Sequence, residues 1–307
     1  MKRAIVTGAN GFIGSALVNE LLANGVFVYA LVHKSADNLP EHGNIKIIPF
    51  ELNEAGSFKY NFENIDVFYH LAWQGSSGDD RSDPILQYHN VKWAMDCLYF
   101  AQKIGAKRFV GAGSLMEKEV LYDVPEMGNK PSAVSVYGTA KLTSHYMTKT
   151  IAAGIGIEHL WCYLTAYGVG DSPHRFVNAT IKKMLDGEKT LKFTKADQYY
   201  DFVYITDTAK ALYLTGLKGI PFCAYYIGSG NPNQLNYYIK EVKNILNAEC
   251  ELDFGAYNYK GIYLPIEEFN CEVLQNDTGF KCDVSFSDGI LKTAEWLKEV
   301  VKRWGDI

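Results

Sequence analysis

The chain has 307 residues, of which 48% are hydrophobic and 21% are charged. These proportions are those of a globular protein long enough to bury a core, which excludes a disordered or fibrous class. The net charge of −5 and the lack of any basic tract exclude the clustered positive charge that binds nucleic acid, and no apolar run reaches the roughly 20 residues of a membrane-spanning helix.

The first half of the chain alternates apolar strand patterns with amphipathic helix patterns. Since strands that alternate with helices form right-handed crossovers, the pattern predicts a parallel sheet. The predicted class is α/β, with a Rossmann-type doubly wound sheet over residues 1–166. Strands are expected at 3–7, 26–32, 45–50, 67–71, 108–111 and 159–164, and helices at 12–22, 88–103 and 135–152.

The second half has a different pattern of elements, in which short strands are expected between helices. These helices are predicted at 176–185, 206–217, 237–246 and 287–303. We expect a smaller, mixed α/β C-terminal lobe for the substrate, made of residues 167–200 and 219–307. Residues 201–218 are expected to return to the first domain.

Glycines at positions 8, 11 and 14 lie in the sequence TGANGFIG, directly after a predicted strand and at the start of a predicted helix. Glycine permits positive φ and lets a backbone approach a pyrophosphate, which the N–H groups of a helix N-terminus then bind. The alternative is a merely structural tight turn. We predict that this loop binds a dinucleotide through Gly8, Asn10, Gly11, Phe12, Ile13 and Gly14.

The end of the second predicted strand reads Val32-His33-Lys34, without the carboxylate that usually holds the ribose 2′-hydroxyl of NAD. His33 and Lys34 are instead suited to a 2′-phosphate, so NADP(H) is favoured and NAD(H) stays possible. The alternative for Lys34 is an ordinary solvated lysine.

Tyr137 and Lys141 are four residues apart in a predicted helix and therefore lie on one face. A nearby positive charge favours the phenolate of a tyrosine and brings its pKa toward neutral pH. Tyr137 can then exchange a proton with a sugar oxygen while a nicotinamide exchanges a hydride. Ser114, just after the fifth strand, can hydrogen-bond that oxygen. The alternative for the pair is an ordinary surface helix.

Taken in this order, the motifs resemble the extended short-chain dehydrogenase/reductase family of nucleotide-sugar epimerases, dehydratases and reductases. The resemblance runs from Lys2 to Trp304 and rests on TGANGFIG, HLAW (70–73), HNV (89–91), YGTAK (137–141), DFVYITD (201–207) and the C-terminal Gly279-Phe280 and DGI. It implies that Lys141 also holds the nicotinamide ribose. It further implies cofactor contacts for Glu51, Leu52, Leu71, Ala72, Trp73 and Asn90, of which Asn90 would support the lysine.

The chain departs from the family in three places. Leu115-Met116 follow Ser114 where sugar dehydratases carry an Asp-Glu pair, so water elimination is not expected. Cys162 and Tyr200 stand where arginine is usual, so the contacts to the substrate diphosphate must be reassigned. The predicted substrate-binding residues are Trp73, Gln74, Ser114, His174, Arg175, Phe176, Lys195, Gln198 and Tyr200.

The first functional hypothesis is NADPH-dependent reduction of the 4-keto group of a nucleoside-diphosphate 4-keto-6-deoxyhexose, as in the synthases of CDP-abequose and CDP-paratose. The product would be a deoxysugar donor for surface polysaccharide. A nucleotide-sugar 4-epimerase with bound NAD needs the same residues and is the alternative. Another sugar or small-carbonyl oxidoreductase is a further possibility. A non-catalytic NAD(P)-sensing protein is a rival from another class, but would be expected to lose Tyr137 or Lys141.

The remaining expectations concern surroundings and partners. The six cysteines show no CxxC or Cys/His spacing, so we expect reduced thiols and no metal. The first residues lack the charged and apolar segments of a secretory signal, so we expect a cytoplasmic protein without membrane partners. The family resemblance implies a homodimer built on the helices at 88–103 and 135–152.

Overall fold

The computed structural model describes residues 1–304, and the contacts divide them into two compact units. Unit 1 comprises Met1–Leu164, Thr208–Ile227 and Cys271–Phe280. Unit 2 comprises Thr165–Asp207, Gly228–Asn270 and the described part of Lys281–Ile307. Residues 305–307, the end of the predicted C-terminal lobe, lie outside the described part.

Unit 1 is built on a seven-stranded sheet in the order β11-β6-β5-β4-β1-β2-β3, in which all neighbouring strands are parallel. This sheet confirms the predicted Rossmann-type α/β fold. Its strands are β1 (Arg3–Thr7), β2 (Phe27–Val32), β3 (Ile45–Pro49), β4 (Val67–His70), β5 (Arg108–Ser114), β6 (Glu158–Leu164) and β11 (Ala224–Tyr226).

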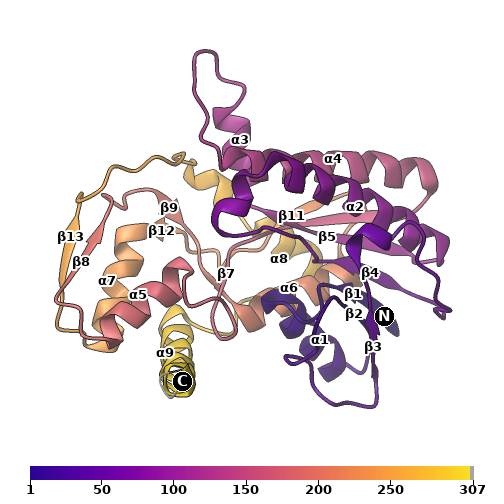
Figure 1. Cartoon of the computed structure of the whole chain (residues 1–307), viewed down its shortest axis with the longest axis horizontal. Coiled ribbons are helices and arrows are strands. Elements are labelled where there is room, and N and C mark those ends of the chain that lie inside the picture. Colours follow the sequence, from indigo (N-terminus) through magenta and orange to yellow (C-terminus); the bar gives the residue numbers. More distant parts are fainter. Residues whose placement is uncertain (305–307) are drawn as a thin grey trace. The chain divides into compact units, whose positions relative to one another are not determined.

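Helices cover both faces of this sheet (Figure 1). α2 (Pro84–Lys103) and α4 (Ser135–Ile155) pack side by side on one face, and α1 (Phe12–Ala23) lies on the other with α6 (Ile205–Lys218). The connection between α3 (Met116–Asp123) and α4 projects away from unit 1. The unit also contains α8 (Glu272–Thr278) and two 3₁₀ turns, η1 (Leu52–Glu54) and η2 (Gly78–Ser82).

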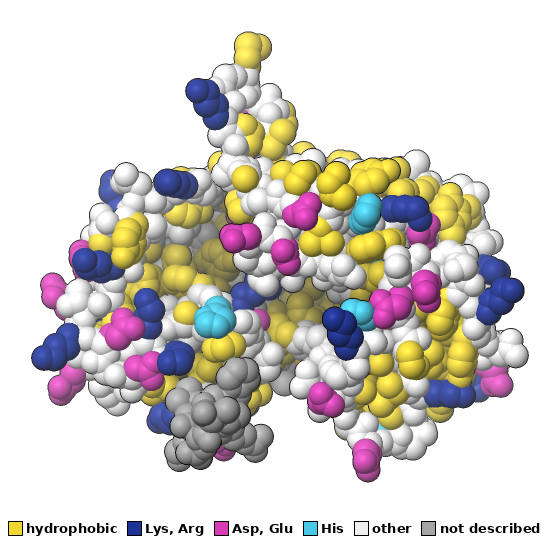
Figure 2. Space-filling view, viewed as in Figure 1, with side chains coloured by type: hydrophobic (Ala, Val, Ile, Leu, Met, Phe, Trp, Pro, Cys, Tyr) yellow, Lys and Arg dark blue, Asp and Glu magenta, His cyan; other side chains and the backbone are white. Residues whose placement is uncertain are grey.

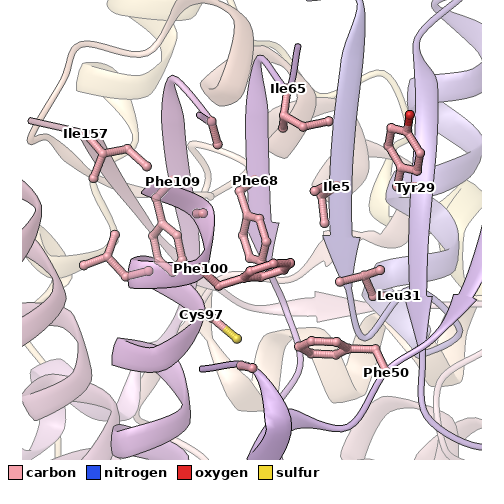
Figure 3. Close-up of a cluster of buried hydrophobic side chains, with 14 of the residues drawn as sticks. Ile5, Tyr29, Leu31, Phe50, Ile65, Phe68, Cys97, Phe100, Phe109 and Ile157 are labelled. Atoms are coloured by element: carbon pink, nitrogen blue, oxygen red, sulfur yellow. The ribbon is translucent and has the colours of Figure 1, made fainter. Parts of the chain in front are cut away.

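The core between the sheet and α2 is largely aromatic (Figure 3). Phe68 of β4 and Phe109 of β5 stack with ring centroids 5.8 Å apart, and Phe100 of α2 packs edge-on against Phe68. β1, β2, β4 and β5 are buried on both faces, which is why they read in the sequence as continuous rather than alternating apolar runs, whereas the edge strand β3 is partly exposed.

Unit 2 surrounds an aromatic cluster centred on Phe202, whose ring contacts Tyr200, Tyr238 and Phe286. Three strand pairs frame it, namely β7 with β10, β9 with β12 and β8 with β13. Its elements are β7 (Ala166–Tyr167), α5 (Phe176–Leu185), β8 (Thr190–Phe193), β9 (Tyr199–Tyr200), β10 (Val203–Tyr204), β12 (Asn233–Gln234), α7 (Leu235–Leu246), β13 (Glu251–Phe254), η3 (Ile266–Phe269) and α9 (Phe286–Trp304).

The division between the units differs from the predicted boundaries at four segments, the shortest of which is residues 165–166, which belong to unit 2. Residues 219–227 belong to unit 1 because β11 extends the parallel sheet beside β6. Residues 271–280 also belong to unit 1, where Asp277 accepts a hydrogen bond from the Tyr225 hydroxyl over 2.8 Å. Residues 201–207 belong to unit 2, where Asp201 accepts from both the N–H and the hydroxyl of Ser229.

Within residues 1–304, no helix combines the length and the apolarity needed to cross a bilayer. The same part of the chain contains no group of His, Cys, Asp and Glu side chains arranged to hold a metal ion.

Candidate active site

The glycine loop after β1 is closed by backbone contacts that only glycine allows. Gly8 has φ of +66°, and its carbonyl accepts from the N–H of Gly11 over 3.0 Å. A Cβ on Gly14 would lie 2.1 Å from that same carbonyl oxygen. Because no real Cβ can come that close, glycine at position 14 is what lets α1 start directly against the loop.

The N-terminus of α1 is open to an anion. Gly11 is the N-cap, no side chain caps the helix, and its first turn carries no acidic residue. The first N–H groups of a helix have no partner within the helix, and they lie at the positive end of its dipole. The loop therefore has the backbone geometry that a dinucleotide diphosphate needs, and its contact with Gly8, Gly11, Phe12, Ile13 and Gly14 stays a prediction.

The segment after β4 lies against this loop. The hydroxyl of Thr7 accepts from the N–H groups of Leu71 and Ala72, both at 3.2 Å, and lies 3.1 Å from Nδ1 of His70. A Cβ on Gly8 would lie 2.9 Å from the Cα of Ala72. Leu71 and Ala72 thus lie beside the glycine loop, where the family resemblance places them. Burial lowers the pKa of His70 to about 3, so its ring is neutral and structural.

Asn10 connects the glycine loop to the segment after β2. Its side-chain amide donates to the Ser35 hydroxyl over 2.9 Å, and its carbonyl oxygen accepts from the N–H of Asn38 over 2.8 Å. These bonds hold Asn10 to the protein itself, so its part in a cofactor site is to shape the loop.

The His33 ring meets the Glu51 carboxylate at the ends of the neighbouring strands β2 and β3. Nε2 of His33 lies 3.0 Å from Oε1 of Glu51, and both side chains are about half exposed. Lys34 is exposed. The predicted basic end of β2 is therefore accompanied by a carboxylate from the next strand.

Tyr137 and Lys141 are both buried on α4 and share one neighbour, Trp73. The Lys141 ammonium lies 3.7 Å from the centre of the Trp73 ring, and the rings of Trp73 and Tyr137 meet edge to face with centroids 6.1 Å apart. The Arg81 guanidinium lies 4.9 Å from the Tyr137 ring centre. Arg81 thus contacts the Tyr137 ring directly, whereas Lys141 contacts the ring of Trp73, which in turn contacts Tyr137.

Lys141 also connects α4 to β5, because its ammonium donates to the carbonyl of Ala112 over 2.8 Å. Burial lowers the pKa of Lys141 to about 7, an effect that the charge of Glu117 opposes. The aromatic face of Trp73 favours the charged form further. The structure thus brings Lys141 to the same strand that ends at Ser114.

Asn90 and Gln87 on α2 fix the segment after β4. The Asn90 side chain accepts from the Gln74 N–H over 2.9 Å and donates to the Gln74 carbonyl over 2.8 Å. Gln87 accepts from the indole N–H of Trp73 over 2.9 Å. Asn90 therefore holds Gln74 in this structure, and the support of Lys141 that the family resemblance implies stays a prediction.

The predicted substrate residues of unit 2 fall into two groups. His174 and Lys195 are exposed, and Arg175 is partly buried with its Nε 3.8 Å from Asp171. Burial raises the pKa of Asp171 to about 6, although Arg175 opposes the shift. In contrast, the Phe176 and Tyr200 rings pack against Phe202, while Gln198 is buried and its backbone carbonyl accepts from the N–H of Leu235.

Sequence reasoning missed Arg81, Gln87 and Glu117. Arg81 lies in η2 and carries no local motif, and Gln87 reads as an ordinary polar helix residue. Glu117 did have a signal, because Ser114-Leu115-Met116-Glu117 has the S-x-x-E spacing of a capping box. The side chain of Glu117 accepts from the N–H of Ser114 over 2.8 Å.

Comparison with known proteins places this geometry in a family. The model of the NAD dependent epimerase/dehydratase family matches residues 4–228. The chain is 26% identical to a putative UDP-glucose 4-epimerase of Methanocaldococcus jannaschii, an alignment that covers 96% of this chain and 98% of that one. It is 24% identical to the CDP-abequose synthase of Salmonella muenchen, covering 95% of this chain and 96% of the other.

The fold is also that of a solved structure, the Bordetella bronchiseptica enzyme WbmF in complex with NAD+. The two superpose with a TM-score of 0.80 at 20% identity, over 99% of this chain and 95% of WbmF.

Replacement of Gly14 tests the glycine loop. We expect Gly14→Ala to lower the free energy of unfolding by about 1–3 kcal/mol and to weaken dinucleotide binding, because the new methyl group overlaps the Gly8 carbonyl. Urea unfolding and calorimetric titration with NAD+ measure the two effects. Gly154→Ala is the matched control, since a Cβ there meets nothing within 4 Å. A Gly14→Ala variant as stable as the wild type would contradict this account of the loop.

Proposed function

Because the chain belongs to the NAD dependent epimerase/dehydratase family, we propose that it exchanges a hydride between carbon 4 of a nucleotide-linked hexose and a bound nicotinamide cofactor. The observation that carries the proposal is the cluster of Tyr137, Trp73 and Lys141 in the same unit as the open N-terminus of α1. The cofactor, when bound, supplies a carbon that accepts or returns the hydride.

The residues of the chain then handle the proton. Tyr137 takes the proton of the sugar hydroxyl or returns it, and the charges of Lys141 and Arg81 favour its phenolate. Ser114 donates a hydrogen bond to the same sugar oxygen and stabilises the charge that develops on it.

The two positions that carry an Asp-Glu pair in sugar dehydratases carry no acid or base in this chain. The positions after Ser114 carry Leu115 and Met116, which transfer no proton. The next carboxylate, Glu117, is fully buried and already bonded to Ser114 and Trp161. This favours oxidation and reduction at one carbon over dehydration.

For the cofactor, the contact of the Glu51 carboxylate with His33 favours NAD over NADP. A 2′-phosphate carries up to two negative charges, and a carboxylate 3.0 Å from His33 would oppose it. The same carboxylate is an acceptor suited to the two hydroxyls of an NAD ribose. Of the two basic residues that favoured NADP in the sequence, only the exposed Lys34 has no carboxylate paired with it in the part of the chain that the structure describes.

A cofactor that is retained and regenerated suits epimerisation, in which a ketone is formed and then reduced on the other face. We therefore propose nucleotide-sugar 4-epimerisation with NAD as the function. Reduction of a 4-keto-6-deoxyhexose with NADPH is the second candidate. It is supported by the 24% identity to the CDP-abequose synthase over nearly the whole chain.

In unit 2 we assign the substrate diphosphate to Arg175, with His174 and Lys195 as further cations. Arg175 is only loosely paired with Asp171, at 3.8 Å, so its planar fork is available for bidentate contact with phosphate. The same unit contains Gln198, Phe176 and Tyr200. Because they pack within it, we assign them the role of supporting the substrate site and not of contacting the diphosphate.

A substrate panel tests the reaction. We expect purified protein with NAD+ to interconvert the 4-epimers of a UDP-, CDP-, dTDP- or GDP-linked hexose, as measured by chromatography. Tyr137→Phe should slow this at least about a hundredfold, because the proton transfer is lost. Oxidation of NADPH by a 4-keto-6-deoxyhexose, without epimerisation, would support the reductase instead. A Tyr137→Phe variant that keeps its activity would contradict both.

The cofactor choice is tested at Glu51. We expect the wild type to bind NAD+ at least tenfold more tightly than NADP+, and Glu51→Gln to narrow that preference about tenfold, since a hydrogen bond to a charged group is worth about 1.5–3 kcal/mol. Calorimetric titration with both dinucleotides measures it. Glu54→Gln, an exposed carboxylate of the same segment, is the control. Tighter binding of NADP+ by the wild type would overturn the assignment.

We also propose that two copies of the chain associate through α2 and α4. An apolar groove of about 790 Å³ runs between these helices and is lined by Tyr88, Val91, Met95, Val136, Ala140 and Met147. Figure 2 shows hydrophobic side chains gathered over the same helices. Tyr88 is 67% exposed, and Met127 on the projecting connection is 98% exposed. A surface of this kind is typical of an interface.

Light scattering tests the association. We expect twice the mass of the chain for the wild type and a shift to the single-chain mass for Met147→Lys, because a charge would be buried in the groove. Ile220→Lys is the control, since Ile220 is also exposed but lies outside the groove. A wild-type mass equal to one chain would exclude the dimer.

A further inference from the structure

Glu117 is a fully buried carboxylate at the start of α3, and its partners come from three other parts of unit 1. Oε1 accepts from the Ser114 N–H over 2.8 Å. The indole N–H of Trp161 on β6 lies 3.1 Å from both oxygens, and Nδ1 of His145 on α4 lies 3.4 Å from Oε2. A buried charge is tolerated only with such a set of donors.

The local sequence explains how the carboxylate reaches Ser114. In a capping box the N-cap serine accepts from an N–H of the first turn, and the glutamate three residues later accepts from the N–H of the serine. Here the helix starts one residue later, with Leu115 as the N-cap, but two similar bonds form: the Ser114 hydroxyl accepts from the N–H of Met116 over 3.3 Å, and Glu117 accepts from the N–H of Ser114. The oxygen of Ser114 is thus held as an acceptor on the protein side, which leaves its own proton for the sugar oxygen.

The neighbouring strand is shaped to admit these groups. A Cβ on Gly113 would lie 2.6 Å from Oε1 of Glu117 and 2.3 Å from Nε1 of Trp161. A Cβ on Gly111 would lie 2.1 Å from the same indole ring. The two glycines of β5 make room for the indole and the carboxylate directly behind Ser114.

We propose that Glu117 is a positioning residue for the hydride-exchange reaction, fixing the Ser114 hydroxyl toward the sugar oxygen and placing a negative charge behind Lys141. The inference rests on the proposed function of Ser114, Tyr137 and Lys141. It goes beyond helix capping because the capped residue is the one that polarises the substrate. Trp161 and the glycines of β5 serve the same arrangement.

The charge of Glu117 acts on Lys141 from α3. The other titratable groups around this lysine are His70 from β4 and Tyr137 on α4, with Arg81 against the Tyr137 ring and His145 against Glu117. Burial lowers the pKa of Lys141, whereas the charge of Glu117 raises the pKa of the same lysine. A lysine is charged below its pKa, so loss of the Glu117 charge makes Lys141 neutral at a lower pH.

Glu117→Gln tests the proposal, because it keeps the shape and an acceptor for Ser114 but removes the charge. In the full-length protein we expect kcat to fall about tenfold. We also expect KM for the sugar nucleotide to change little and the basic limb of the kcat–pH profile to move to lower pH. Trp161→Phe is the matched control, since it removes a hydrogen bond to Glu117 and leaves the charge. It should lower thermal stability without moving that limb.

The outcomes separate this proposal from the function it rests on. Wild-type kcat and pH profile in Glu117→Gln, alongside an inactive Tyr137→Phe, would reduce Glu117 to a helix cap and leave the proposed function intact. An active Tyr137→Phe would overturn the proposed function itself. If Glu117→Gln does not fold, Glu117→Asp is the second variant, since it keeps the charge but withdraws it from Ser114. A reduced kcat with an unmoved basic limb then supports the proposal, and an unchanged kcat overturns it.

Discussion

Unit 1 depends on backbone passing against backbone at the carboxyl ends of β1 and β4. The two contacts that decide it are those of Gly14 with the Gly8 carbonyl and of Gly8 with Ala72, at distances no side chain allows. The Thr7 hydroxyl then holds the N–H groups of Leu71 and Ala72. The same contacts leave the N-terminus of α1 uncovered and direct the chain from Ala72 into Trp73. The proposed anion site at α1 and the position of the Trp73 indole beside Lys141 therefore both follow from these backbone contacts.

The site also buries two groups of opposite charge, Lys141 and Glu117. Lys141 loses hydration and is compensated by the Ala112 carbonyl and the face of Trp73. Glu117 loses hydration and is compensated by N–H groups of backbone and indole. Each group is satisfied mainly by neutral dipoles, so each charge stays free to act on the reacting atoms. A direct ion pair between the two would have neutralised the effect on the phenol.

The fold could be predicted because its signals are local. Continuous apolar runs and the glycine loop decide β1 to β6 and α1, and they need no knowledge of distant residues. The pairing of His33 with Glu51 could not be predicted, because it depends on β2 and β3 being neighbours with their ends in register. The bonds of Asn90 to Gln74 could not be predicted for a related reason, since Gln74 lies on another segment of the chain. The bond of Glu117 to Ser114 could have been predicted, because the two residues have the S-x-x-E spacing of a capping box.

Epimerisation and 4-keto reduction need the same proton and hydride chemistry, so Tyr137, Lys141 and Ser114 cannot decide between them. What differs is the fate of the cofactor, which is kept through an epimerase cycle and exchanged after every reduction. The discriminating residues must therefore be those that hold the adenosine ribose, and His33 and Glu51 occupy the strand ends where that ribose is expected. On the proposed function, selectivity between the two reactions would then reside in the contact of two half-exposed side chains just after β2 and β3, away from Tyr137 and Lys141.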